Sequence, residues 1–193
     1  TQPQMAKKIE SRTIKEFPDG IAEYGSDSLR FTFCALATTG RDVRFDVARI
    51  EGYRNFCNKL WNVAKFALSN TEDFAPGETV REAEVSDPIN RWIADRTSHV
   101  IHSCRKALEE YRFDLYANHI YEFAWHEYCD WYIEMIKPNF WGDAEASERR
   151  RETQQTMLIV FETILKLAHP VMPFLTETLW QEIDLDRSKN QRL

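Results

Sequence analysis

The chain has 193 residues, of which 43% are hydrophobic, so it is long and apolar enough to bury a core rather than stay disordered. Its six glycines are too few for a turn-rich β sandwich or barrel, and no apolar run approaches the roughly 20 residues of a membrane helix. The net charge of −6 argues in general against a nucleic-acid partner, although basic residues are concentrated in one segment.

Helix start and stop signals predict a series of helices with short or medium connections. The first helix is expected at 4–16 and is closed by the turn sequence FPDG at 17–20. GIAEYG at 20–25 is expected to be a short strand or an extended connector, and RDVRFD at 41–46 to be extended. The further predicted helices cover residues 26–40, 46–69, 88–111, 114–137 and 148–168, and a short final helix begins at Pro173.

These elements predict an all-α fold, namely an antiparallel helix bundle with a small N-terminal mixed α/β segment. We place the domain boundary after residue 45, so that residues 1–45 form a connecting segment and residues 46–193 form the bundle. Near the end of the chain, Pro170 and Pro173 interrupt one apolar helix and start another. This stretch is expected to be a corner between packed helices.

The helix predicted at 46–69 carries an unusual polar face. At about 100° per residue, its apolar residues fall on one broad side that is expected to be buried. This predicted stripe comprises Ile50, Tyr53, Cys57, Leu60, Trp61, Ala64 and Leu68. The opposite side holds Asn55, Lys59, Asn62 and Phe66, flanked by Asn58 and Lys65. Phe66 therefore either packs under the N-terminal segment or is available to a ligand.

The chemistry of this polar face suits an unpaired RNA loop. Single-stranded RNA is bound by stacking its bases on aromatic rings, by amide side chains at the base edges, and by Lys and Arg at the phosphates. Residues 41–66 hold six Lys or Arg against three Asp or Glu, and Arg44 and Arg49 extend the basic track. The alternative is that the asparagines face water and Phe66 belongs to the core.

The same residues carry a resemblance to a known family. GYRNFCNKLWNVAKF at 52–66 resembles the anticodon-binding helix of valyl-tRNA synthetases, which are class I aminoacyl-tRNA synthetases. Four other motifs agree in order: GSDSLRF at 25–31, GRDVRFD at 40–46, YEFAWHEYCDWYIE at 121–134 and HPVMPFLTETLWQ at 169–181. The proline corner is shared with the leucine and isoleucine enzymes, whereas RNFCNKLWN is more specific to the valine enzymes.

The resemblance implies an anticodon-binding bundle of the class I type that positions tRNA(Val) for ATP-dependent aminoacylation. The family's HIGH and KMSKS signatures do not occur in this sequence. We therefore expect a fragment of a cytoplasmic valine–tRNA ligase, with no catalytic residue, metal site or cofactor of its own and no membrane partner. ATP and magnesium would serve the parent's catalytic domain. That domain, the editing domain and the C-terminal coiled coil are the expected partners in the same chain, together with tRNA(Val).

Arg44, Lys59, Lys65 and Phe66 match positions that the family uses near the anticodon. Our hypothesis assigns base reading to Phe66, Asn55, Asn58 and Asn62, and phosphate binding to Arg44, Arg49, Arg54, Lys59 and Lys65. Ala48 stands where the family commonly has a basic residue, and neighbouring Arg49 would replace that contact.

Three alternatives remain from the residues. The first is the equivalent domain of a leucine or isoleucine enzyme. The second is a helical scaffold that docks a protein on the same face, and the third is a metal-binding bundle enzyme. His126 and Cys129 lie one turn apart, but no second pair at ligand spacing supports zinc. The aromatic residues between 113 and 132 are expected to pack in the core with their polar tips satisfied, and the four cysteines to be buried, reduced thiols.

Overall fold

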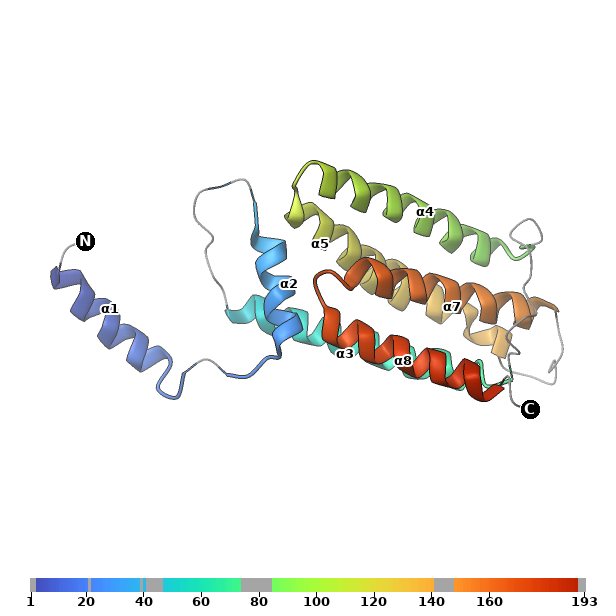
Figure 1. Ribbon diagram of the computed structural model, residues 1–193, viewed down its shortest axis with the longest axis horizontal. Coiled ribbons are helices and arrows are strands. Elements are labelled where there is room, and N and C mark those ends of the chain that lie inside the picture. Colours follow the sequence, from blue (N-terminus) through green and yellow to red (C-terminus); the bar gives the residue numbers. More distant parts are fainter. Residues whose placement is uncertain are drawn as a thin grey trace.

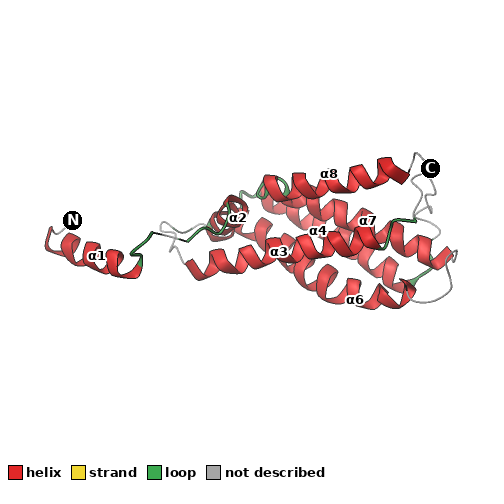
Figure 2. Cartoon of the chain, turned by 90° about the horizontal axis from the view of Figure 1, so that it is seen from below, coloured by secondary structure: helices red, strands yellow, loops and turns green. Residues whose placement is uncertain are grey.

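The computed structural model describes residues 3–20, 22–38, 40, 47–73, 85–140 and 148–190, and its regular structure there is entirely helical (Figure 2). The α-helices are α1 (Pro3–Glu16), α2 (Ser26–Leu36), α3 (Val47–Ser69), α4 (Pro88–Glu109), α5 (Phe113–Tyr121), α6 (Ile133–Ile136), α7 (Glu148–Ala168) and α8 (Pro173–Asn190). None of these helices is long and apolar enough to cross a bilayer within the residues described.

The long helices form a bundle around one core. Figure 1 shows α3, α4, α5, α7 and α8 running along the bundle, while α2 lies across one end and α1 lies apart beyond it. The core receives fully buried side chains from several helices, among them Leu60 of α3, Ile93 of α4 and Phe161 of α7. In α1, by contrast, residues 5–16 are all exposed. The predicted all-α bundle is confirmed.

The N-terminal α/β segment that we expected is wrong for the residues described. Residues 22–25 form a connector without a strand, and Gly25 leads into α2 with φ of 85°, a conformation that glycine adopts at little cost. The extended stretch expected at 41–46 lies outside the described residues. Phe31 of α2 belongs to the core of the bundle, and the boundary after residue 45 stays a prediction. The final helix, expected to be short, spans 18 residues.

The proline corner joins α7 to α8, as predicted, and α2 holds it in place. The Arg30 side chain donates from Nε to the Val171 carbonyl at 3.0 Å and from Nη2 to the Pro170 carbonyl at 3.2 Å. Asp27, which is buried, accepts a hydrogen bond from the Leu175 amide in the first turn of α8 at 2.6 Å. The prolines leave backbone groups without helical partners, and α2 supplies partners for several of them.

A π-helix at Glu122–Tyr132 follows α5, and a 3₁₀ turn at Lys137–Phe140 follows α6. The sequence did not predict the π-helix. At its end, the Ile133 amide donates to the Tyr128 carbonyl five residues earlier, which is the π-helical pattern. The wider turn changes which side chains share a face, so the α-helical period does not apply to this segment.

The predicted core role of the aromatic residues is confirmed for three tyrosines. Their hydroxyls donate across the bundle: Tyr116 to the Leu167 carbonyl at 2.5 Å, Tyr128 to the Met157 carbonyl at 2.8 Å, and Tyr132 to Asn90 Oδ1 at 2.9 Å. Each hydroxyl is therefore paired where water is excluded. The prediction is wrong for Phe113 and Trp131, which are 42% and 60% exposed.

The four cysteines are reduced, as predicted, but only Cys104 and Cys129 are buried, while Cys34 and Cys57 are half-buried. Burial raises the pKa of the Cys104 thiol to about 11 and that of Cys129 to about 12. Both therefore remain protonated at neutral pH and act as small core side chains.

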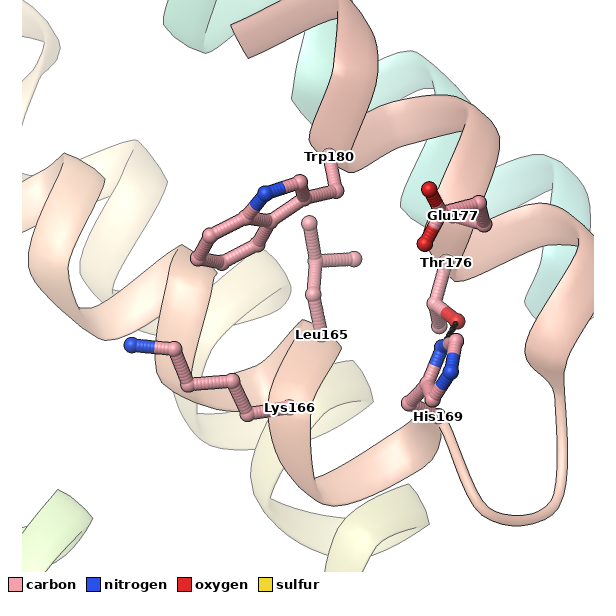
Figure 3. Close-up of a pocket in the computed structure, with 6 residues that line it drawn as sticks. All are labelled: Leu165, Lys166, His169, Thr176, Glu177 and Trp180. Atoms are coloured by element: carbon pink, nitrogen blue, oxygen red, sulfur yellow. Dashed lines mark hydrogen bonds between the residues drawn. The ribbon is translucent and has the colours of Figure 1, made fainter. Parts of the chain in front are cut away.

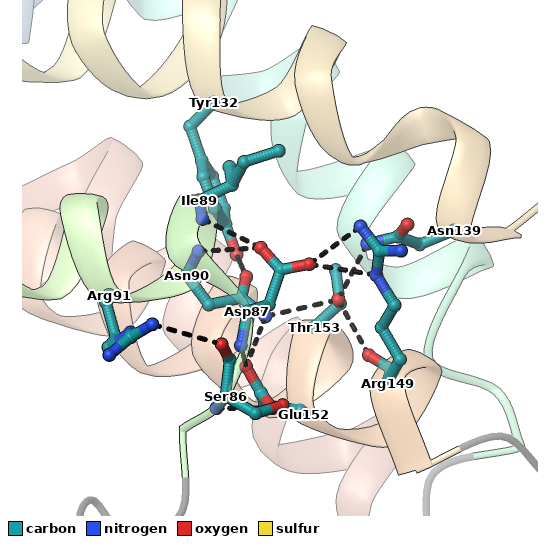
Figure 4. A network of polar contacts seen from close by, with 10 residues as sticks. All are labelled: Ser86, Asp87, Ile89, Asn90, Arg91, Tyr132, Asn139, Arg149, Glu152 and Thr153. Atoms are coloured by element: carbon teal, nitrogen blue, oxygen red, sulfur yellow. Dashed lines mark hydrogen bonds and ion pairs between the residues drawn. The ribbon is translucent and has the colours of Figure 1, made fainter.

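A buried carboxylate ties the beginning of α4 to α7 (Figure 4). Glu152 Oε2 accepts hydrogen bonds from the Ser86 amide at 3.0 Å and the Ser86 hydroxyl at 2.9 Å. Its Oε1 accepts from the Asp87 amide at 3.0 Å and from Asn90 Nδ2 at 2.9 Å. Asp87 in turn caps α4 by accepting from the Ile89 amide at 2.7 Å. We call Glu152, Ser86, Asp87 and Asn90 the Glu152 cluster.

Candidate nucleic-acid interface

Helix α3 buries a different stripe of residues from the one predicted. Its buried residues are Ile50, Phe56, Leu60, Val63, Ala64 and Ala67. Tyr53, Cys57 and Leu68 are only half-buried, and Trp61 is 36% exposed. At about 100° per residue, the buried face is turned by about 60° from the predicted one. The predicted stripe was therefore wrong in its centre, although Ile50, Leu60 and Ala64 belong to both.

The packing of Phe56 explains why the buried face of α3 differs from the predicted one. This ring is fully buried and lies 5.4 Å from Phe31 of α2 and 5.1 Å from Tyr121 of α5, measured between ring centroids. Tyr121 also stacks on Trp125 at 5.5 Å, which extends the cluster along the π-helix. Aromatic clusters of this kind contribute packing energy beyond their buried area, so Phe56 determines which way α3 faces.

The exposed face of α3 carries most of the predicted site residues. We call the exposed set Arg54, Asn55, Asn58, Asn62 and Lys65 the α3 face. Arg49 is exposed as well, but at about 100° per residue it lies about 180° around the helix from Asn58. No ion pair of Arg49, Arg54 or Lys65 occurs among the residues that the structure describes. Arg44 lies outside the described residues. The α3 face thus offers amides and unneutralised cations to a ligand.

Phe66 lies at the edge of the α3 face rather than at its centre. Its ring is half-buried and packs against the core. It makes an edge-to-face contact with Phe140 of the 3₁₀ turn, with the ring centroids 6.1 Å apart. Of the two roles considered for Phe66, the packing role is therefore partly confirmed. The ring packs against Phe140, however, and not under the N-terminal segment as expected. The remaining exposed part borders the α3 face.

Lys59 is engaged by a carboxylate. Its Nζ donates to Asp130 Oδ1 at 2.7 Å and lies 5.5 Å from the centroid of the Trp125 ring. The hydrogen bond to Asp130 raises the pKa of Lys59 above its ordinary value. On the π-helix, Asp130 Oδ2 is also 3.4 Å from His126 Nδ1. This flank of α3 is consequently neutralised, in contrast to the α3 face itself.

Trp61 is the residue that sequence reasoning missed. The predicted stripe placed its ring in the core, but it lies at the surface, and Lys65 Nζ is 6.0 Å from its centroid. A ring with a lysine beside it offers a stacking surface next to a cation. The sequence did hint at this, because the apolar side of α3 is wide and includes Phe56, Val63 and Ala67 as well as the predicted stripe. An apolar side of that width does not show which residues lie at the middle of the buried face and which lie at its edge.

The seam between α7 and α8 holds a cavity of about 280 Å³, shown in Figure 3. Its polar groups already have partners, because His169 Nδ1 lies 2.9 Å from Thr176 Oγ1 and Lys166 Nζ lies 5.2 Å from the centroid of the Trp180 ring. Within the described ranges, no group of three or more His, Cys, Asp or Glu residues is arranged to hold a metal ion. The α3 face therefore stands out as the candidate site.

The fold defines an all-helical bundle domain, and its sequence matches a known family. The family model described as the anticodon-binding domain of tRNA ligases matches residues 90–192, which is just over half of the chain. The chain is also 50% identical over 187 residues to the valine–tRNA ligases of three Legionella pneumophila strains, Lens, Paris and Philadelphia 1. The match covers 95% of this chain and 20% of each relative, so the chain spans about a fifth of their length.

The chain belongs to the anticodon-binding domain family of tRNA ligases. The resemblance noted in the sequence is thereby confirmed at the level of the family.

Proposed function

We propose that the chain is the anticodon-binding domain of a valine–tRNA ligase, and that the α3 face contacts the anticodon loop of valine tRNA. The observation that carries this proposal is the exposure of Arg54, Asn58, Asn62 and Lys65 together on one side of α3. Loop bases are bonded by amide side chains, and phosphates are held by lysine and arginine. The family match and the similarity to valine–tRNA ligases support the same role.

The residue roles follow from exposure and charge. Asn55, Asn58 and Asn62 bond base edges, and the exposed parts of Trp61 and Phe66 supply stacking surfaces. Arg49, Arg54 and Lys65 hold phosphates, and we assign the same role to Arg44, which precedes them in the sequence. Lys59 contributes less to phosphate binding, because Asp130 already neutralises its charge.

The longer protein is part of this proposal. Its catalytic domain, with ATP and magnesium, performs the aminoacylation, and the present chain raises the fraction of encounters in which the correct tRNA reaches that domain. The longer protein would also contain the editing domain and the C-terminal coiled coil, and residues 1–45 would connect the bundle to the rest of it. We propose that this enzyme is cytoplasmic and that its bundle is of the class I type. No group of this chain performs a chemical step.

The test is equilibrium binding of the protein to the tRNAs for valine, leucine and isoleucine across a series of salt concentrations. We expect the tightest binding with valine tRNA and an affinity that falls steeply with salt, because phosphate contacts release counterions. Arg54→Ala should weaken binding, while Arg105→Ala, at an exposed position of α4, serves as the matched control.

Two outcomes contradict the proposal. Preference for leucine or isoleucine tRNA assigns the chain to the sister enzyme. An affinity that does not depend on salt, or an Arg54→Ala variant that binds like Arg105→Ala, removes the α3 face as an RNA-binding surface.

A further inference from the structure

A row of ion-pairing groups borders the α3 face. Lys59 lies one helical turn from Asn55 and from Asn62, both of which are exposed on that face. Its Nζ is 2.7 Å from Asp130 Oδ1, and Asp130 Oδ2 is 3.4 Å from His126 Nδ1. The Asp130 carboxylate therefore has a lysine on one oxygen and a titratable imidazole on the other.

His126 lies in the π-helix between two carboxylates. Its Nδ1 faces Asp130, and its Nε2 is 3.8 Å from Glu122 Oε2. The Tyr121 ring of α5 meets the imidazole edge-on at 6.1 Å between centroids, and burial raises the pKa of that tyrosine, so it stays neutral. The His126 side chain is 49% exposed, so it exchanges protons with solvent. Between about pH 6 and 8, histidine is the side chain that ordinarily changes charge, whereas carboxylates stay ionised and lysine stays protonated.

The neighbouring helices bring further charged groups to the π-helix, and these are paired with one another. Arg96 of α4 donates from Nε and Nη2 to the two carboxylate oxygens of Glu127, at 2.6 and 2.7 Å. Glu134 of α6 is close enough to contribute to the raised pKa of Lys59, but its carboxylate pairs with Lys137 at 2.6 Å. From α3, Lys59 is the cation that shares a carboxylate with the imidazole.

A proton on His126 weakens the hold of Asp130 on Lys59. The imidazolium attracts the Asp130 carboxylate and repels the Lys59 ammonium, because both cations then share one carboxylate. The formal charge of the three side chains rises from zero to +1. This flank of α3 then attracts a phosphate more strongly, and Lys59 exchanges Asp130 for that phosphate more easily.

We infer that His126 and Asp130 control the access of Lys59 to RNA phosphates, so that protonation of His126 strengthens RNA binding. Asp130 is a positioning residue here, because it acts through Lys59. The inference rests on the proposed binding of RNA by the α3 face. By linkage, RNA binding takes up protons, and the affinity rises as the pH falls through the range in which histidine gains its charge.

Isothermal titration calorimetry of the full-length wild-type protein with valine tRNA, at about pH 6.5, tests the inference without any substitution. Measurements in buffers of different ionisation enthalpy count the protons that are bound when the complex forms. We expect the uptake of a fraction of one proton per complex. No uptake, or a release of protons, overturns the inference.

The variant His126→Gln assigns the uptake to this histidine, because glutamine is polar but does not titrate. Wild-type protein should bind valine tRNA several-fold more tightly at about pH 6 than at about pH 8, and His126→Gln should lose most of this difference. His99→Gln, at an exposed histidine of α4, is the matched control and should retain it. Equal pH dependence in the two variants contradicts the role of His126.

The salt dependence of binding shows whether Lys59 is the group that is released. The slope of log affinity against log salt should be steeper at the lower pH by up to about 0.7, the value for one phosphate contact with a single strand. Lys59→Ala should remove this steepening, and Asp130→Asn should give the steeper slope at both pH values. If Lys59→Ala still steepens at the lower pH, His126 holds the phosphate itself, and the release of Lys59 is overturned.

The variant Arg54→Ala separates this inference from the proposed RNA binding. It should weaken binding by the same factor at both pH values, because Arg54 lies outside the group formed by Lys59, Asp130 and His126. If Arg54→Ala weakens binding but the wild-type affinity does not change with pH, only the inference fails. If Arg54→Ala has no effect at either pH, the α3 face is not the RNA-binding surface, and the proposed function fails.

Discussion

Amide and charged side chains occur in two very different settings in this molecule, the Glu152 cluster and the α3 face. In the Glu152 cluster, Glu152 is 2% exposed and each of its two carboxylate oxygens accepts two hydrogen bonds. On the α3 face, Arg54, Asn58 and Lys65 are exposed. The same chemical groups therefore serve stability in one place and are available to a ligand in the other.

The two regions differ in whether their polar groups already have hydrogen-bond or ion-pair partners within the protein. A buried polar group without a partner costs free energy, so the partners of Glu152 must come from the protein itself. Exposed polar groups exchange water for a ligand at little cost, so their partners come from outside. This contrast predicts that substitutions in the Glu152 cluster change the free energy of unfolding, and those on the α3 face change RNA affinity.

The largest expected effect is on stability, at Glu152. Glu152→Ala leaves the amides of Ser86 and Asp87 and the Asn90 side chain without their acceptor. We expect the free energy of unfolding to fall by about 2–4 kcal/mol, as for other buried hydrogen-bonded groups. Urea denaturation followed by circular dichroism measures this. Glu182→Ala, at an exposed glutamate of α8, is the control and should change stability by less than about 0.5 kcal/mol. Equal effects would mean that the cluster is not structural.

The Glu152 cluster should also make stability depend on pH. Burial alone would raise the pKa of Glu152, but hydrogen bonds from Asn90, Ser86 and Asp87 outweigh it, so the pKa lies below the ordinary value of a glutamate. A lowered pKa means that the stabilisation is fully present above the unfolded-state value and is lost as the pH falls through the folded-state value. Wild-type protein should therefore lose stability on acidification below about pH 5.

Glu152→Gln isolates this contribution, because it cannot titrate. The stability difference between wild type and Glu152→Gln should shrink as the pH is lowered from 7 to 4, and denaturation at several pH values measures it. A difference that stays constant would assign the acid sensitivity to other carboxylates.

The next effect concerns the two aromatic residues that border the α3 face. Trp61→Ala should weaken binding of valine tRNA by about 1–3 kcal/mol, the typical loss for one stacked base. Phe66→Ala should in addition lower the free energy of unfolding by about 1 kcal/mol, because it breaks the ring contact with Phe140. Filter binding and urea denaturation of both variants test the distinction. A Trp61→Ala variant with full affinity removes Trp61 from the site.

The helices were predictable because their signals are local. Asp87 followed by Pro88 predicted the start of α4, and the structure confirms Asp87 as its cap. The prolines at 170 and 173 likewise predicted the corner between α7 and α8. These effects act within a few residues, so no tertiary information was needed.

The orientation of α3 was not predictable in the same way. Its apolar residues cover more than one face, and the choice between them depends on Phe56, whose partners Phe31 and Tyr121 come from other helices. The pairing of Lys59 with Asp130, 71 residues apart, depends on the same packing. Of the candidate site, the sequence therefore identified the helix and its exposed asparagines, and it missed Trp61 and the neutralisation of Lys59.

The smallest effect distinguishes the two lysines of α3. Lys65→Ala should lower the slope of log affinity against log salt by about 0.7, the loss of one phosphate contact with a single strand. Lys59→Ala should leave this slope nearly unchanged and lower the free energy of unfolding by about 0.2–1 kcal/mol, because Lys59 already pairs with Asp130. Asp130→Asn frees Lys59 and should steepen the slope. If Lys59→Ala flattens the slope as much as Lys65→Ala does, the ion pair opens in the complex and Lys59 holds a phosphate itself.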